Sequence, residues 1–161
     1  MTTNRQISSN PKENLKAIRI LFGSLVVGIV FFAIIAVSIN LVNTPAGIPG
    51  IEEVYFIAGA GIAALGCIIS ARLLYNRGIN SIRNLTASLN EKLNHYRSLL
   101  IKCLALCDGA AIFSVIVYFL TGDFRVLIVT AVMLAVMFSF APSKKRMITE
   151  LDIDWNDQDA L

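Results

Sequence analysis

The sequence predicts an all-α polytopic membrane protein whose four transmembrane helices form two antiparallel hairpins. Of its 161 residues, 56% are hydrophobic and only 16% are charged, whereas an ordinary soluble domain is about 25% charged. The mean hydropathy is +0.69. Four apolar runs come close to the roughly 20 residues that span a bilayer, and the basic residues gather next to one end of these runs.

The apolar runs divide the chain into an arm, a membrane domain and a tail. The runs are residues 20–42, 54–74, 99–120 and 124–141. They build a membrane domain of residues 20–142, preceded by a polar N-terminal arm of residues 1–19. The tail, residues 143–161, ends in a series of acids, so we expect it to be partly disordered. The first run is longer than the apolar core of a cleavable signal peptide and is expected to remain as a span.

Basic residues predict the orientation of the spans. Lys and Arg gather beside the cytoplasmic ends of transmembrane helices. Thirteen of the 14 basic residues fall in the N-terminal arm, around the connection 75–98 or just after the fourth run, which leaves Arg125 alone on the other side. We therefore expect a multi-pass protein of the inner (cytoplasmic) membrane with both termini in the cytoplasm. The net charge of +3 reflects this topology, and no nucleic-acid partner is expected.

The connection of residues 75–98 has the pattern of an amphipathic helix. Apolar residues recur at spacings of three and four, while polar residues fill the other face; the apolar positions are Ile82, Leu85, Leu89, Leu93 and Tyr96. Such a helix could lie on the inner leaflet or continue into the third span. No Pro or Gly interrupts residues 82–108, which favours one continuous helix projecting into the cytoplasm, capped by Asn80 or Ser81 after Gly78.

Asp108 is the only acid within the four apolar runs. It lies about 14 Å along a helix from Leu99, close to the middle of a bilayer, at the depth of Gly66 on the second span and Gly28 on the first. A buried acid in a span is a functional candidate, and no basic residue shares its depth. We expect a neutral, protonatable acid that is hydrogen-bonded between helices or exposed to a water-filled crevice. The alternative is a protonatable site for proton- or ion-coupled work.

Small residues recur at helical spacing in three of the runs, and such faces let two helices approach closely. These predicted helix-packing residues are Gly59, Ala63, Gly66 and Ser70 in the second span, Ala105 and Gly109 in the third, and Gly28 in the first. The contact they make could lie within the chain, or it could join the chain to another copy or to a partner in the membrane. The sequence leaves these alternatives open.

No residue pattern points to catalysis or to a bound metal. Cys67, Cys103 and Cys107 fall within the spans, but their spacing is unlike that of metal-binding cysteine pairs, and free cysteine is a common small buried residue. The single histidine, His95, is expected to be solvated. Nucleotide-binding and hydrolase motifs are missing from the sequence, so we expect neither an enzyme nor a cofactor.

Two resemblances follow from these residues. The glycine-alanine run Gly59–Gly66 and the acidic span within Tyr96–Leu120 resemble the c subunit of ATP synthase. That resemblance implies that Asp108 carries a proton, with Gly59, Gly61 and Gly66 packing beside it. The segments CDGAAIF (107–113) and PSKKRMITELDID (142–154) resemble small uncharacterised inner-membrane proteins of Bacteroidetes-type bacteria, which implies no activity.

These observations favour a non-enzymatic integral inner-membrane protein, a structural or accessory subunit that packs through small-residue helix faces. Its expected partners are the lipid bilayer and either a second copy or another membrane protein. The alternative is a proton- or ion-coupled transport component that uses Asp108.

Overall fold

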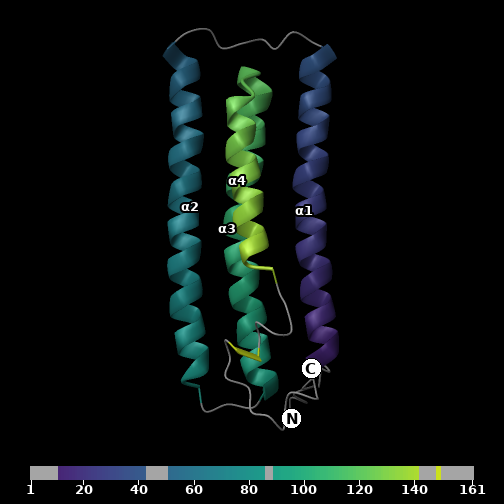
Figure 1. Ribbon diagram of the computed structural model, residues 1–161, viewed down its shortest axis with the longest axis vertical. Helices are drawn as coiled ribbons and strands as arrows, with labels where there is room; N and C mark the ends of the chain where they lie inside the picture. The colour runs from purple at the N-terminus through teal and green to yellow at the C-terminus, as the bar shows by residue number, and fades with distance from the viewer. Residues whose placement is uncertain (1–10, 43–50, 86–88, 142–147, 150–161) are drawn as a thin grey trace, which may run out of the picture.

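The computed structural model describes residues 11–42, 51–85, 89–141 and 148–149, and these ranges contain four long or medium helices. They are α1 (Pro11–Val42), α2 (Ile51–Arg83), α3 (Leu89–Thr121) and α4 (Arg125–Ser139). The prediction of an all-α fold is confirmed. The helices lie side by side along one axis, and successive helices run in opposite directions (Figure 1).

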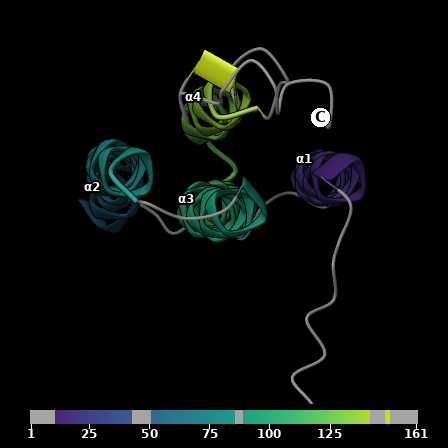
Figure 2. The same ribbon diagram turned by 90° about the horizontal axis from the view of Figure 1, so that it is seen from below.

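The centre of the bundle is α3. Seen along the bundle axis, α1 and α2 lie on opposite sides of α3, and α4 covers a third side (Figure 2). In this view no described helix covers the fourth side of α3, opposite α4. The helix pairs in extended contact are α2 with α3, α3 with α4, α1 with α3 and α2 with α4.

The first two helices do not form the packed hairpin that the sequence predicted. Extended contact joins each of α1 and α2 to α3, but it does not join α1 to α2. The eight residues 43–50 that separate these helices in the chain could span up to about 27 Å if extended, which exceeds the diameter of a helix, about 10 Å. This connection therefore leaves room for α3 between the two helices.

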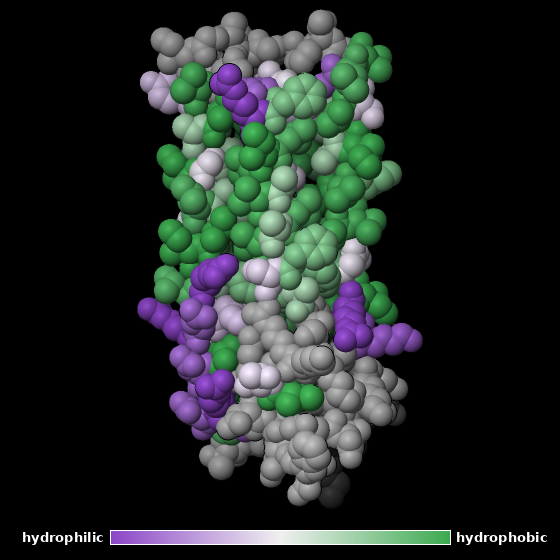
Figure 3. Space-filling view, viewed as in Figure 1, coloured by the Kyte–Doolittle hydropathy of each residue, from purple (hydrophilic) through white to green (hydrophobic). Residues whose placement is uncertain are grey.

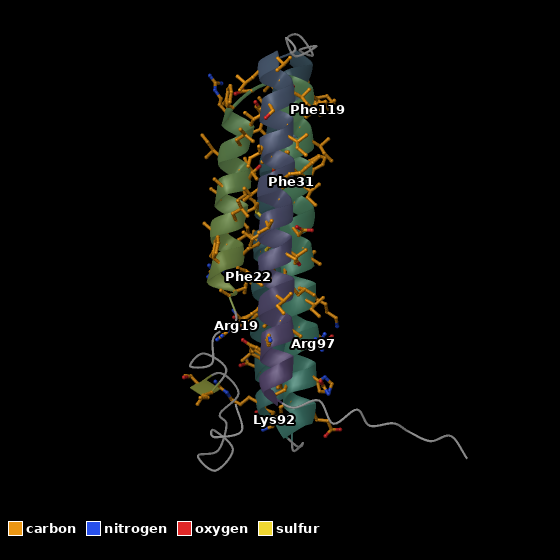
Figure 4. The ribbon with its side chains drawn as sticks, turned by 90° about the vertical axis from the view of Figure 1, so that its right-hand side faces the viewer. Arg19, Phe22, Phe31, Lys92, Arg97 and Phe119 are labelled. Atoms are coloured by element: carbon orange, nitrogen blue, oxygen red, sulfur yellow. The ribbon has the colours of Figure 1, made fainter. Side chains whose placement is uncertain are left out.

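Three helical segments are long and apolar enough to cross a membrane: Lys16–Val42, Val54–Arg83 and Glu91–Thr121. The fourth helix, α4, is apolar but has only 15 residues, fewer than the expected run of 124–141, so its role as a span stays a prediction. Figure 3 shows a broad band of hydrophobic residues between two ends where hydrophilic residues gather. Arg19, Lys92 and Arg97 lie toward one of these ends, while Phe31 and Phe119 lie within the band (Figure 4).

Beyond the apolar band, α2 and α3 continue side by side as a helical extension whose buried residues continue the core of the bundle. Its buried residues are Tyr75, Ile79, Ile82, Leu93, Tyr96, Leu99 and Leu100. Arg72, Arg77 and Asn94 are among the polar residues exposed around it. A buried apolar core inside a polar surface is what a helix pair in water requires.

The predicted helix over residues 82–108 is wrong at its beginning. Instead of ending at Gly78, α2 runs through it to Arg83, and the chain then leaves the helix at Asn84 and Leu85. The reason lies in packing, because a Cβ atom on Gly78 would lie only 2.5 Å from Leu99 Cδ1. Gly78 therefore permits a close contact between α2 and α3, and it does not act as a helix terminator.

A tight link joins the last two helices. Gly122 has a φ of 72°, a conformation that glycine adopts without a steric penalty. Asp123 Oδ1 accepts a hydrogen bond of 2.8 Å from the Arg125 backbone N–H. The charged groups of the two side chains are 3.9 Å apart, but Arg125 is 83% exposed, so this ion pair adds little stability.

Aromatic pairs connect α4 with its neighbours. Phe22 of α1 and Phe138 of α4 pack edge to face with ring centroids 5.5 Å apart; Phe22 lies on the side of α1 that faces α4 (Figure 4). The rings of Tyr75 in α2 and Phe140, just after α4, are 5.2 Å apart. These contacts hold the end of α4 against both flanking helices.

We predict that Leu93→Ala loosens the extension on both helices. Leu93 is 2% exposed, and truncating a buried leucine to alanine costs about 2–5 kcal/mol. Hydrogen exchange should accelerate in residues 89–98 and also in residues 75–83 of α2. The neighbouring Asn94 is exposed, so Asn94→Ala should change neither segment. If the rate of hydrogen exchange in residues 75–83 of α2 were unchanged in Leu93→Ala, the packing of the two helices would be contradicted.

Candidate functional site

Asp108 lies within the apolar part of α3 and is half-buried. It is six residues from Lys102, about 9 Å along the helix axis, and 13 residues from Thr121, about 20 Å. Among the described residues, its carboxyl group has no hydrogen-bond or ion-pair partner. Asp108 is therefore a polar group without a fixed contact in an apolar surrounding.

The carboxyl group of Asp108 is turned away from α2. Cys103 marks the side of α3 that contacts α2, because its Sγ donates a hydrogen bond of 3.6 Å to the carbonyl oxygen of Ala71. Asp108 follows Cys103 by five residues, a rotation of about 140° at 3.6 residues per turn. Because α1 and α2 flank α3 on opposite sides (Figure 2), Asp108 lies on the α1 side, whereas Gly66 belongs to α2.

The predicted small-residue faces lie mostly on the outside of the bundle. Gly28, Gly66, Ser70, Ala105 and Gly109 are exposed, and Gly59 and Ala63 are half-buried. A Cβ atom added to any of these glycines would meet nothing within 4 Å. In the described part of the chain, these glycines therefore bring no two helices together. The small residues buried in α2 are alanines instead: Ala60, Ala64 and Ala71.

Two of these faces border the same surface. On α2, Ser81, Ser70 and Ala63 lie on one face of the helix, because they are separated by 11 and 7 residues. On α3, Ser98 shares a face with Ala105 and Gly109, at spacings of 7 and 4. Ser81 and Ser98 line one groove between the two helices. The small residues that share their faces farther into the apolar band therefore border the side of α3 that no described helix covers. Gly66, four residues before Ser70, is exposed on the same side of α2. We call Ala63, Gly66, Ser70, Ala105 and Gly109 the open face.

The cysteines behave as small packing residues. Cys103 and Cys107 are fully buried and Cys67 is half-buried. Over the ranges that the structure describes, no group of three His, Cys, Asp or Glu residues is arranged to hold a metal ion. Burial against neighbouring helices and the hydrogen bond of Cys103 to Ala71 account for the positions of these thiols.

The other polar side chains in the apolar band differ in their hydrogen bonds. Ser114 Oγ donates a hydrogen bond of 2.7 Å to the Ala110 carbonyl oxygen of its own helix. Asn40 Nδ2 donates one of 3.2 Å to the Tyr118 carbonyl oxygen, which joins α1 to α3. Thr130 Oγ1 is buried with no partner in the described residues. Sequence reasoning missed the role of Asn40, although an amide near the end of an apolar run is a signal for a contact between helices.

A second group of residues was also missed because its members belong to different helices. His95, Ser98 and Lys102 of α3 line a groove together with Gly78 and Ser81 of α2. We call it the α2–α3 groove. Considered singly, His95 and Lys102 predict only solvated side chains, and only the pairing of α2 with α3 brings them to one site.

Comparison of the chain with protein-family models, with curated proteins and with solved structures found no match. Functional inference therefore rests on the residues of the chain and on their geometry.

We predict that a cysteine at position 108 cross-links to α1 and not to α2. In a variant lacking the three native cysteines, Asp108→Cys should form a disulfide with single cysteines placed within residues 25–32 of α1. The depth is set by Asn40, which contacts Tyr118, ten residues after Asp108. Gly66→Cys, at similar depth on α2, is the control and should give little product. A dominant 108–66 disulfide would contradict the orientation of Asp108.

Proposed function

We propose that this chain is a non-enzymatic integral protein of the inner membrane, with both termini in the cytoplasm. In this proposal it is a structural or accessory subunit, and its open face packs against a second copy or against another membrane protein. The proposal is supported first by the three helices with the length and composition of membrane spans.

The length of the apolar band supports the proposed insertion. Residues 103–121 of α3 extend about 28 Å and residues 54–71 of α2 about 27 Å, close to the roughly 30 Å of a hydrocarbon core. Both stretches end at an exposed basic residue, Lys102 and Arg72. The helical extension beyond these residues has a polar surface, which favours water, and its basic residues favour the cytoplasmic side.

The observation that carries the proposed assembly is the exposure of the small residues. Lipid tails are as apolar as leucine side chains, so helices associate in a bilayer through close packing, which small residues permit. The added Cβ at Gly66 or Gly109 meets no atom of this chain within 4 Å. These positions are therefore free to receive a helix from outside.

We predict that Gly66→Leu disperses an assembly of this protein. In mild detergent, the variant should dissociate at a concentration about tenfold higher than the unchanged protein, a loss of roughly 1.4 kcal/mol, because leucine blocks close approach of the partner helix. The measurement is the mass of the protein–detergent complex during dilution.

Gly61→Leu is the matched control. Gly61 belongs to the same helix, and an added Cβ there also meets nothing within 4 Å, but it points about 140° away from Gly66. Dispersal by both variants would argue for a general effect of leucine. An unchanged mass for Gly66→Leu would count against the open face as the site of assembly.

A second candidate function is proton- or ion-coupled transport through Asp108. It is favoured by one observation, which is that the half-buried carboxyl group has no partner among the described residues. A carboxyl group without a fixed partner can release and regain a proton, or bind a cation, without breaking a contact of the bundle. Ionisable groups within spans often mark such pathways.

We predict for this candidate that Asp108→Asn abolishes proton flux into proteoliposomes under an imposed pH gradient. The amide keeps the size of the side chain but cannot exchange a proton. Asp123→Asn, which changes an acid in the turn between α3 and α4, should leave the flux intact. Flux that persists in Asp108→Asn, or unchanged protein that gives none, removes the transport function and leaves the accessory role.

A further inference from the structure

The α2–α3 groove has a volume of about 270 Å³ and lies where the two helices leave the apolar band. Its walls combine three kinds of side chain. They are the apolar Leu74, Ile82, Leu85 and Leu99, the small Gly78, Ser81 and Ser98, and the ionisable His95 and Lys102. Polar and apolar side chains are therefore mixed along the walls of one groove.

The polar groups of the groove are not used by the bundle. Ser81, His95, Ser98 and Lys102 are exposed, and none of them has a hydrogen-bond or ion-pair partner among the described residues. Glu91, an acid on the same side of α3, is 11 residues from Lys102, about 16 Å along the axis. The ammonium group of Lys102 therefore faces the groove without a neighbouring acid of its own helix.

The shape of the groove follows from its small residues. Gly78 lets Leu99 pack directly against the α2 backbone, so the two helices lie close together at the floor. Ser81 and Ser98 have short side chains, which leave space above this contact. A volume of about 270 Å³ is many times what one water molecule needs, so the groove can admit a small polar group such as a phosphodiester with its adjoining glycerol.

We infer that the α2–α3 groove binds the headgroup of an anionic glycerophospholipid of the inner leaflet, such as phosphatidylglycerol. Lys102 pairs with the phosphate, while His95, Ser81 and Ser98 donate hydrogen bonds to phosphate and glycerol oxygens. Leu74, two residues beyond Arg72, lines the groove near Lys102 and contacts the glycerol carbons of the lipid. Basic pockets between helices on the cytoplasmic side are suited to such headgroups. The inference rests on the proposed membrane insertion, because only then does the groove lie at headgroup depth.

Native mass spectrometry of the full chain released from mixed micelles tests this inference. With equal amounts of phosphatidylglycerol and phosphatidylcholine present, the unchanged protein should retain phosphatidylglycerol in preference. Lys102→Gln should reduce that preference about fivefold, the effect expected of one basic residue near a headgroup. Ser98→Leu fills the groove without changing its charge and should reduce retention of phosphatidylglycerol as well.

Arg72→Gln is the matched control, because Arg72 is exposed at a similar level of α2 but does not line the groove. Its preference should equal that of the unchanged protein. An equal loss in Arg72→Gln and Lys102→Gln, or full retention in Ser98→Leu, would overturn the inference. Displacement of the lipid by millimolar glycerol 1-phosphate would also overturn it, in favour of a site for soluble phosphates.

Alkaline carbonate extraction of membranes separates this inference from the proposed function. Protein that resists extraction but shows no preference between the two lipids leaves the membrane assignment intact and removes the lipid site alone. If carbonate releases the protein from membranes, both the membrane assignment and the lipid site are ruled out. Resistance together with the expected preference supports both.

Discussion

The packing of α3 against three other helices is the constraint on which the rest of the bundle depends. Half of the apolar window of α3 is buried inside the structure, compared with 11% for α1 and 17% for α2. Leu100, Cys103, Leu104, Cys107, Ala111 and Val115 are all fully buried along it. With α1 and α2 held on opposite sides of this helix, each keeps most of its own surface available to lipid or to another protein.

The positions of the helices could be predicted because hydropathy and charge depend on sequence alone. The long apolar runs and the basic residues at one end each carry a direct physical meaning. The order of packing could not be predicted in the same way. A helix with lipid on one side and apolar neighbours on the other is apolar all round, so its pattern does not reveal which face is internal. Ala64 is buried while Gly66, two residues later, is exposed.

The two candidate sites also show which features could be predicted from sequence alone and which required the packing of the helices. Asp108 was identifiable because a single acid in an apolar run is conspicuous. Counting from Leu99 placed it near the middle of a bilayer, whereas the apolar stretch 103–121 leaves it nearer to the end at Lys102. Its direction required knowledge of where α1 and α2 lie around α3. The α2–α3 groove carried no such signal, because Gly78 suggested a helix end and Lys102 suggested a solvated side chain. The contact between Gly78 and Leu99 shows instead that Gly78 serves the packing of α2 against α3. This packing places Lys102 beside a groove.

The length of α4 has a consequence for the surrounding bilayer in the proposed orientation. Its 15 residues extend about 22 Å, roughly 8 Å less than a hydrocarbon core. Such hydrophobic mismatch is met by local thinning of the lipid or by association with another short helix. The sides formed by α1 and α2 carry longer apolar surfaces, so the lipid around one molecule would differ in thickness from side to side. A protein of this shape would be enriched in thin regions of membrane, and α4 would face the thinnest lipid.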